Sequence, residues 1–239
     1  MVSNGLTLSH MSKAWIYYCS SEEELLQKSQ EDLELAIHET LKKYPDCRLG
    51  LAGGSTPKAL YEKLAGADLP WEKIKIIQLD ERYVPSDDKE SNLKMLRQTL
   101  LSHAPVPPEN VFVFDTSLSY ESAAEEMTRQ LEKLGSDRAL LDVLVLGAGS
   151  DGHIASLFEG DSALQSTELA STATAEGYPT PQRLTLTLPA LAHARALLLL
   201  KGPEKAAVIG AIEGKLSYPL LTAFKELSKT ATVKVLAYV

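Results

Sequence analysis

Residues 143–158 have the sequence VLVLGAGSDGHIASLF, and this stretch is the starting point for predicting the fold. Its first four residues are apolar and rich in β-branched valine, which favours a buried strand. Three glycines follow, and they interrupt regular structure and let the backbone approach a ligand closely. His153 comes directly after them, and histidine is the side chain that titrates nearest neutral pH. Because open α/β sheets place their chemistry on loops after central strands, we expect a functional site at His153.

Three interpretations of this loop are open from the residues alone. The first is a dinucleotide site, because GAGSDG matches G-x-G-x-x-G, but Asp151 would meet the pyrophosphate and residues 168–173 contain no acidic strand end. The second is a serine hydrolase elbow at 148–152, which would need an acid and a later histidine as partners of the serine. The only histidine after His153 is His193, which lies in an alanine-rich helical pattern. The third is an ordinary tight turn with a structural histidine.

Composition limits the class of protein. The chain has 239 residues, 44% of them hydrophobic and 23% charged, as is usual for a globular protein with a sizeable core. A net charge of −8 argues against nonspecific binding to nucleic acid or to an acidic membrane. An anionic ligand would therefore have to be met by local Arg, Lys and backbone N–H groups. No apolar run approaches the length of a membrane span.

The cysteines and the N-terminus carry no sign of export. Cys19 and Cys47 make neither a disulfide framework nor a metal set, and we expect buried free thiols in a cytoplasmic protein. Residues 1–12 lack an apolar signal segment and are expected to form a loose tail. No His or Cys cluster has metal-ligand spacing, so we expect neither a metal nor a cofactor.

Strand and helix patterns alternate along the chain. Strands are predicted at 15–19, 48–52, 74–79, 111–114, 141–146, 182–188, 196–200 and 232–239, and helices between most of them at 20–45, 58–64, 93–101, 120–134, 189–194 and after 206. Residues 162–181 are small and polar and are predicted to form a long loop over the site. We expect one α/β domain over 1–239, with a doubly wound, mostly parallel, modified Rossmann-like sheet and helices on both faces.

Two further motifs lie between a predicted strand and the segment after it. GGSTP at 53–57 joins a strand to a helix and could cradle an anion, or could be an ordinary helix-capping turn. DERYVP at 80–85 places two carboxylates and a guanidinium at the end of a buried strand. Such charges are costly unless they are paired or used, so an Asp–Arg pair that fixes the loop is the alternative to a site.

Together with QRLTLTLP at 182–189 and GPEKA at 202–206, these motifs resemble the 6-phosphogluconolactonase family, within the wider glucosamine-6-phosphate isomerase-like superfamily. The resemblance extends over about residues 15–212 and is loose beyond Gly214. It departs at Glu159, where the family usually has proline in SLFPG.

The resemblance implies hydrolysis of 6-phosphogluconolactone to 6-phosphogluconate, the second step of the oxidative pentose phosphate pathway, without metal or cofactor. It implies that His153 is the general base and that Asp80 and Arg82 lie beside the sugar. The expected phosphate-binding set is Gly53, Gly54, Ser55, Thr56, Arg183 and Lys205. The partner is a small phosphosugar lactone, with no nucleic acid or membrane, and the chain is expected to be a monomer or a small homo-oligomer.

The chemistry of the residues agrees with this function. A neutral histidine can deprotonate water and then return the proton to the ring oxygen, and Asp151 or Asp80 could orient the imidazole. Glycine-loop N–H groups or Arg82 could stabilise the oxyanion. A sugar-phosphate deaminase or isomerase is the nearest alternative, but Phe158 stands where those enzymes have the glutamate of DGHIAFNEP. A noncatalytic sugar-phosphate sensor is the other, and one domain leaves little room for its partner-binding part.

Overall fold

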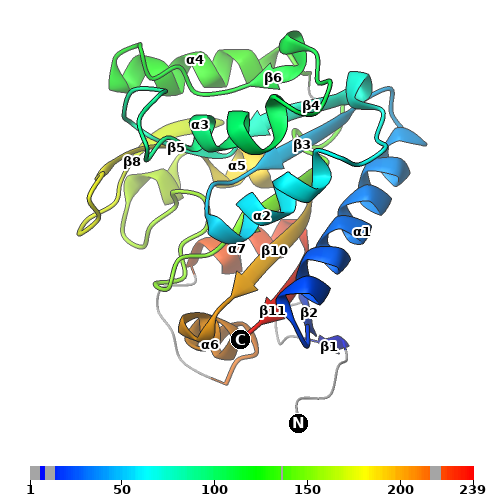
Figure 1. Cartoon of the computed structure of the whole chain (residues 1–239). Coiled ribbons are helices and arrows are strands. Elements are labelled where there is room, and N and C mark those ends of the chain that lie inside the picture. The colour runs from blue at the N-terminus through cyan, green and yellow to red at the C-terminus, as the bar shows by residue number, and fades with distance from the viewer. Residues whose placement is uncertain (1–5, 9–13, 136, 216–221) are drawn as a thin grey trace.

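We describe residues 6–8, 14–135, 137–215 and 222–239 of the chain from a computed structural model. Within these residues the main sheet has eight strands (Figure 1). Their spatial order is β1 (Leu6–Leu8), β2 (Ala14–Tyr18), β11 (Thr232–Tyr238), β10 (Arg195–Lys201), β7 (Val143–Gly147), β3 (Cys47–Leu51), β4 (Ile74–Gln78) and β6 (Val111–Phe112). Only β1 runs antiparallel to its neighbour, so the predicted mostly parallel sheet is confirmed.

Helices cover both faces of this sheet, as predicted. The helices are α1 (Glu22–Leu41), α2 (Ser55–Leu64), α3 (Asn92–Leu96), α4 (Tyr120–Glu132), α5 (Leu188–Leu191), α6 (Ala206–Ile212) and α7 (Thr222–Thr230). One buried apolar cluster packs α1, α2 and α3 against one face of the sheet. A second packs α4, α5, α6 and α7 against the other face. Figure 1 shows α1 and α2 in front of the strands and α5 and α7 behind them. The central strands are apolar throughout because both faces are covered.

Serine side chains start three of the helices where the sequence predicts it. Ser21 accepts a hydrogen bond from the Glu24 N–H at 3.1 Å, and Ser91 and Ser119 cap α3 and α4 in the same way. Each satisfies a backbone donor that the first helical turn leaves without an intrahelical partner. The predicted helix 93–101 is divided, because α3 continues as a π-helical segment at Arg97–Leu101.

A second sheet corrects the prediction that residues 162–181 form one long loop. Within that range, Ser162–Gln165 is a short 3-10 helix and Ala170–Thr174 is strand β8. β8 pairs antiparallel with β9 (Gln182–Leu186), which pairs in turn with β5 (Asp80–Arg82). Small residues in β8, rather than a local apolar pattern, allow it to pack closely against α4, so only the nonlocal pairing makes it a strand.

Two smaller differences concern the chain ends. β1 lies within the stretch 1–12 that is expected to be loose, and its backbone pairs Leu6 with Tyr17. The rest of that stretch lies outside the described residues. α7 has no counterpart among the predicted elements. Cys19 and Cys47 are free and buried, as predicted.

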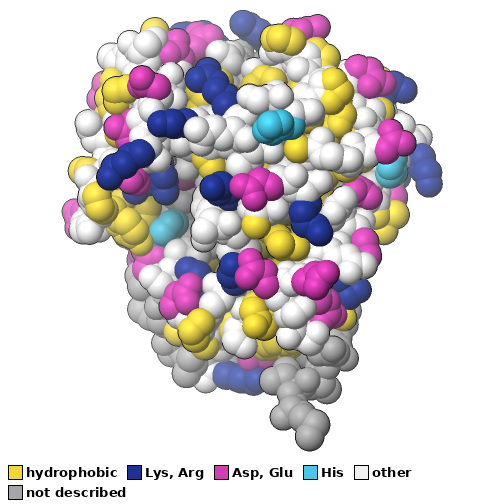
Figure 2. Space-filling view, viewed as in Figure 1, with side chains coloured by type: hydrophobic (Ala, Val, Ile, Leu, Met, Phe, Trp, Pro, Cys, Tyr) yellow, Lys and Arg dark blue, Asp and Glu magenta, His cyan; other side chains and the backbone are white. Residues whose placement is uncertain are grey.

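On the face seen in Figure 2, acidic and basic side chains are interspersed, with apolar side chains between them. No helix in the described part of the chain is both long and apolar enough to span a membrane.

The order of the strands places a crevice between β3 and β7. From β3 the chain runs outward through β4 and β6, then returns to β7 and continues in the opposite direction through β10 and β11. Ligands bind in open α/β sheets at such a switch point, beyond the carboxyl ends of the strands. The Gly53 loop and the Gly147 loop meet here, since a Cβ built on Gly147 would contact Pro57 at 3.5 Å.

Candidate active site

A cavity of about 350 Å³ occupies this switch point. That volume is in the range of small-molecule sites. All of the site residues predicted from the sequence line the cavity except Asp151, which lies behind His153. The walls come from the ends of β3, β7 and β10 in the main sheet and from β5 and β9 in the second sheet. The two sheets together therefore enclose the site.

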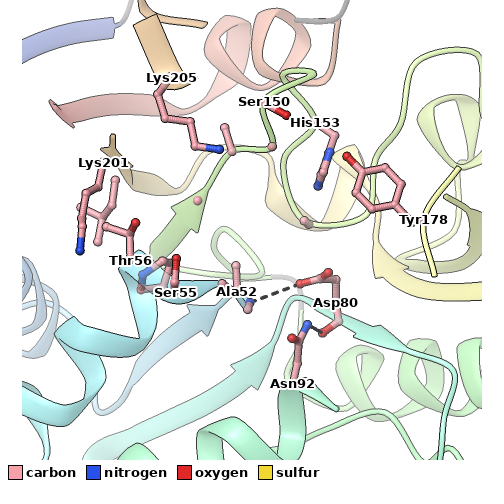
Figure 3. Close-up of a pocket in the computed structure, with 18 of the residues that line it drawn as sticks. Ala52, Ser55, Thr56, Asp80, Asn92, Ser150, His153, Tyr178, Lys201 and Lys205 are labelled. Atoms are coloured by element: carbon pink, nitrogen blue, oxygen red, sulfur yellow. Dashed lines mark hydrogen bonds between the residues drawn. The ribbon is translucent and has the colours of Figure 1, made fainter. Parts of the chain in front are cut away.

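An aspartate and a histidine form a hydrogen-bonded pair at the cavity. Nδ1 of His153 lies 2.6 Å from Oδ1 of Asp151, and the same oxygen lies 3.3 Å from the His153 backbone N. Burial raises the pKa of Asp151, but the hydrogen bond and charge of His153 outweigh it and lower that pKa to about 2. The carboxylate therefore stays ionised and accepts a hydrogen bond from the protonated Nδ1 of His153. Nε2 is then the nitrogen that can accept a proton, and the ring projects into the cavity (Figure 3).

The glycine loop is folded tightly around this pair. The Gly149 N–H donates to the His153 carbonyl at 2.9 Å, and the Gly152 N–H donates to the Gly149 carbonyl at 3.1 Å. Gly152 has a φ of 89°, which a side chain would disfavour. Ala155 also has a positive φ, 49°, although it carries a Cβ. Backbone strain of this kind persists at functional sites, where the surrounding structure enforces it.

Two aromatic rings enclose the imidazole. The ring centroid of Phe158 lies 4.4 Å from that of His153, and the centroid of Tyr178 lies 5.8 Å away with its ring nearly perpendicular. The Tyr178 hydroxyl also donates to Oδ2 of Asp151 at 3.2 Å. The sequence did not identify Tyr178, because it lies in the aperiodic segment 162–181.

Asp80 bridges three segments and does not orient the imidazole. Its Oδ2 accepts from the Ser156 hydroxyl at 2.8 Å, and its Oδ1 lies 3.5 Å from the Gly53 backbone N. Asp80 and Arg82 make no ion pair with each other, so the alternative of an Asp–Arg pair that fixes this loop is wrong. Of the two candidate aspartates, Asp151 is the one hydrogen-bonded to His153.

Glu81 holds the chain beside Asp80 in place. It is 1% exposed, and its carboxylate accepts from the backbone N–H of Asn92 at 2.7 Å and of Leu93 at 2.8 Å. Burial raises the pKa of Glu81, and these hydrogen bonds oppose the rise. Asn92 in turn donates from Nδ2 to the Asp80 carbonyl at 3.0 Å. Asn92 lines the cavity and was not predicted to be a site residue.

Two arginines face the cavity from neighbouring strands. Arg82 of β5 pairs in register with Arg183 of β9. Each donates to a backbone carbonyl, Arg82 to Glu90 at 2.6 Å and Arg183 to Thr180 at 2.7 Å. Burial and then the charge of Arg82 lower the pKa of Arg183. Neither forms an ion pair with a carboxylate in the described residues, so both contribute positive charge to the cavity.

The opposite side of the cavity is a candidate anion-binding end. α2 begins at Ser55 after Gly54, whose φ is 111°, and the backbone N–H groups of a first helical turn favour an anion. Figure 3 shows Lys201 and Lys205 on the same side as Ser55 and Thr56, and His153 with Tyr178 on the other. Lys201 also pairs with Glu22 at 2.5 Å. Lys201 was not predicted to be a site residue, although a lysine directly after a predicted buried strand could have indicated a charged group at the site.

The fold and the site define a doubly wound α/β protein that has a histidine paired with an aspartate and a candidate anion-binding end in one cavity. The chain belongs to the family described as glucosamine-6-phosphate isomerases/6-phosphogluconolactonase, whose sequence profile matches residues 20–230. That match agrees with the resemblance found from the motifs.

Several individual relatives within this family carry the name 6-phosphogluconolactonase. The chain is 40% identical over 156 residues to a 6-phosphogluconolactonase of Thermotoga maritima, covering 65% of this chain and 69% of the relative. It is 32% identical over 206 residues to a 6-phosphogluconolactonase of Nostoc sp., covering 82% and 85%. A crystal structure of 6-phosphogluconolactonase from Thermotoga maritima superposes with a TM-score of 0.84 at 32% identity, covering 94% of this chain and 99% of that one.

Proposed function

We propose that the protein hydrolyses 6-phospho-D-glucono-1,5-lactone to 6-phospho-D-gluconate, the second step of the oxidative pentose phosphate pathway. The observation that carries the proposal is the Asp151–His153 pair, which presents Nε2 to a cavity with an anion-binding end. The names of the relatives support the same activity.

The phosphate is bound away from the reacting carbon. The N-terminus of α2, with the hydroxyls of Ser55 and Thr56, receives its oxygens, and the Gly53-Gly54 turn lets the backbone come close. Lys205, in the short 3-10 helix after β10, adds a charge-assisted hydrogen bond to the phosphate. Arg183, whose guanidinium lies 5.8 Å from the Tyr178 ring, reaches toward the phosphate from the second sheet and adds positive charge. This arrangement supplies locally the positive charge that a chain of net charge −8 lacks overall. The lactone carbonyl then lies toward His153.

Hydrolysis proceeds by two proton transfers through one imidazole. Nε2 of His153 takes a proton from water as the water oxygen bonds to C1 of the lactone. Asp151 stabilises the imidazolium and keeps Nδ1 protonated. The tetrahedral intermediate collapses with cleavage of the bond from C1 to the ring oxygen, and the imidazolium gives its proton to that oxygen. The product acid ionises, and the histidine returns to its neutral form.

Negative charge on the carbonyl oxygen needs donors in the transition state. Arg82 lines the cavity and forms no ion pair with a described carboxylate, and the glycine loop carries backbone N–H groups nearby. Asp80 holds the Gly53 loop and Ser156 in position around the sugar. None of these steps uses a metal or a cofactor. Phe158, which packs on His153, stands at the position where the deaminases have the glutamate of DGHIAFNEP, and this favours hydrolysis over the deaminase reaction.

The test is a rate measurement on freshly generated lactone. Glucose 6-phosphate is oxidised enzymatically, and the disappearance of the lactone is followed above its spontaneous hydrolysis at each pH. Glucosamine 6-phosphate and unphosphorylated gluconolactone serve as comparison substrates. We expect a rate increase with the phosphorylated lactone and neither ammonia release nor isomerisation with the amino sugar. Turnover of glucosamine 6-phosphate alone would replace this proposal with the deaminase function.

A further inference from the structure

The β8–β9 hairpin brings a tyrosine against the Asp151–His153 pair. Tyr178 lies in the loop between these two strands, and Figure 3 shows it beside His153. Its hydroxyl donates to Oδ2 of Asp151, the carboxylate oxygen that His153 does not use. The two oxygens of Asp151 are therefore held from two sides, one by the imidazole and one by the phenol.

We propose that Tyr178 is a positioning residue that acts through Asp151 to fix the orientation of His153. The inference rests on the proposed hydrolysis, because it gives His153 the task of accepting a proton at Nε2. Tyr178 takes no proton from the substrate. It limits rotation of the Asp151 carboxylate, and its ring edge limits rotation of the imidazole.

The loop that carries Tyr178 is preorganised. The Ala175 N–H donates to the Pro181 carbonyl at 2.8 Å and closes the loop, and the Tyr178 N–H donates to the Ala175 carbonyl at 3.3 Å. Pro179 and Pro181 restrict the backbone on the C-terminal side of Tyr178. The Arg183 guanidinium donates to the carbonyl of Thr180, in the same loop, at 2.7 Å. The tyrosine is therefore presented in place before substrate binds.

The phenol is suited to donate rather than to ionise. Burial and the charge of Asp151 raise the pKa of Tyr178, so the hydroxyl keeps its proton at neutral pH. The Arg183 guanidinium lies 5.8 Å from the centre of the Tyr178 ring, on its face. Tyr178 therefore lies between the His153 ring and the Arg183 guanidinium, and its hydroxyl stays protonated there.

The first experiment is a double-mutant cycle on kcat. Tyr178→Phe keeps the ring and removes the hydroxyl, and we expect kcat to fall about threefold to tenfold, as for loss of one hydrogen bond, with KM within about twofold. In an Asp151→Asn background the same change should alter kcat by less than about twofold, because the group it acts through is gone. Tyr238→Phe is the control, since Tyr238 is 37% exposed and Tyr178 36%.

The second experiment does not depend on activity. Nitrogen-15 NMR of protein labelled at histidine reports which imidazole nitrogen of His153 carries the proton. We expect the Nδ1-protonated tautomer in the wild type and a growing fraction of the Nε2-protonated tautomer in Tyr178→Phe. An unchanged kcat and tautomer, or an equal loss of kcat in both backgrounds, would overturn the role of Tyr178. Absence of lactone hydrolysis by the wild type would instead overturn the proposed function, and the tautomer would still report on Tyr178.

Discussion

A methyl group on Gly149 would come within 2.3 Å of the His153 imidazole and equally close to Oδ1 of Asp151. Real Cβ atoms do not approach other heavy atoms this closely, so Gly149→Ala has to displace the Asp151–His153 pair. We expect kcat for the lactone to fall by about tenfold to a hundredfold, part of the 10²–10⁴ that a general base supplies. KM should change little, because the anion-binding end is on the other side of the cavity.

Gly66→Ala is the matched control for this substitution. The nearest atom to a Cβ at Gly66 is a backbone oxygen at 3.8 Å, an ordinary van der Waals contact. We expect wild-type kcat from Gly66→Ala and a similar circular dichroism spectrum from both variants. Wild-type kcat from Gly149→Ala would mean that the geometry of the pair does not govern the reaction.

His153→Ala removes the proposed base. We expect kcat to fall by about 10²–10⁴ with KM nearly unchanged, and His153→Gln to behave alike because an amide cannot accept the proton. Rates are measured over a pH series, with spontaneous hydrolysis subtracted at each point. A folded His153→Ala protein with near wild-type kcat would return this histidine to a structural role.

Lys205→Ala tests the anion-binding end. A charge-assisted hydrogen bond to phosphate contributes about 1.5–3 kcal/mol, so KM for the phosphorylated lactone should rise about tenfold to a hundredfold. Preference over unphosphorylated gluconolactone should shrink by a similar factor. Lys229→Ala is the control, because Lys229 is exposed on α7 and pairs only with Glu226 among the described carboxylates. If the variant kept the full preference, Lys205 would not contact the phosphate.

The Asp46 carboxylate makes the free energy of unfolding depend on pH in the acid range. Burial raises the pKa of Asp46, but Lys75 at 2.8 Å and Arg138 lower it more, to below the ordinary aspartate value. A carboxyl with a depressed pKa in the folded state stabilises above its unfolded pKa, about 3.9, and loses this contribution as the pH falls further. We expect Asp46→Asn to lower the free energy of unfolding by about 1–3 kcal/mol at pH 7.

That difference between wild type and Asp46→Asn should shrink as the pH falls below about 4. The free energies are measured by urea denaturation at each pH. Asp68→Asn is the control, because Asp68 is exposed and has no ion pair in the described part of the chain. An equal destabilisation at pH 7 and pH 3 would show that packing, rather than charge, accounts for the effect of Asp46.

Local sequence was sufficient for the parallel strands of the main sheet, though not for β1, and for the motifs that follow these strands. β3, β7 and β10 are short and largely apolar runs. β7 ends in Gly147, β10 ends in Lys201, and Gly53 follows two residues after the end of β3. Parallel pairing brings the ends of these strands together. Because their carboxyl ends meet at the switch point, motifs more than 100 residues apart, at Gly53 and Lys205, could be predicted to share a site.

Nonlocal contacts determine the features that could not be predicted from the sequence. β8 has no apolar alternation, and its strand conformation depends on pairing with β9 and packing on α4. Tyr178 was missed for the same reason. Whether Asp80 or Asp151 orients His153 also depended on distances that no spacing encodes, since both aspartates come shortly after a strand.

The place of β11 in the sheet has a consequence for synthesis on the ribosome. β11 lies between β2 and β10, so the first parallel strand cannot join the sheet until residues 232–238 have been made. Until then β2 and β10 both present open hydrogen-bonding edges, which invite pairing with other chains. A nascent chain arrested before residue 232 should therefore need a chaperone to shield these edges.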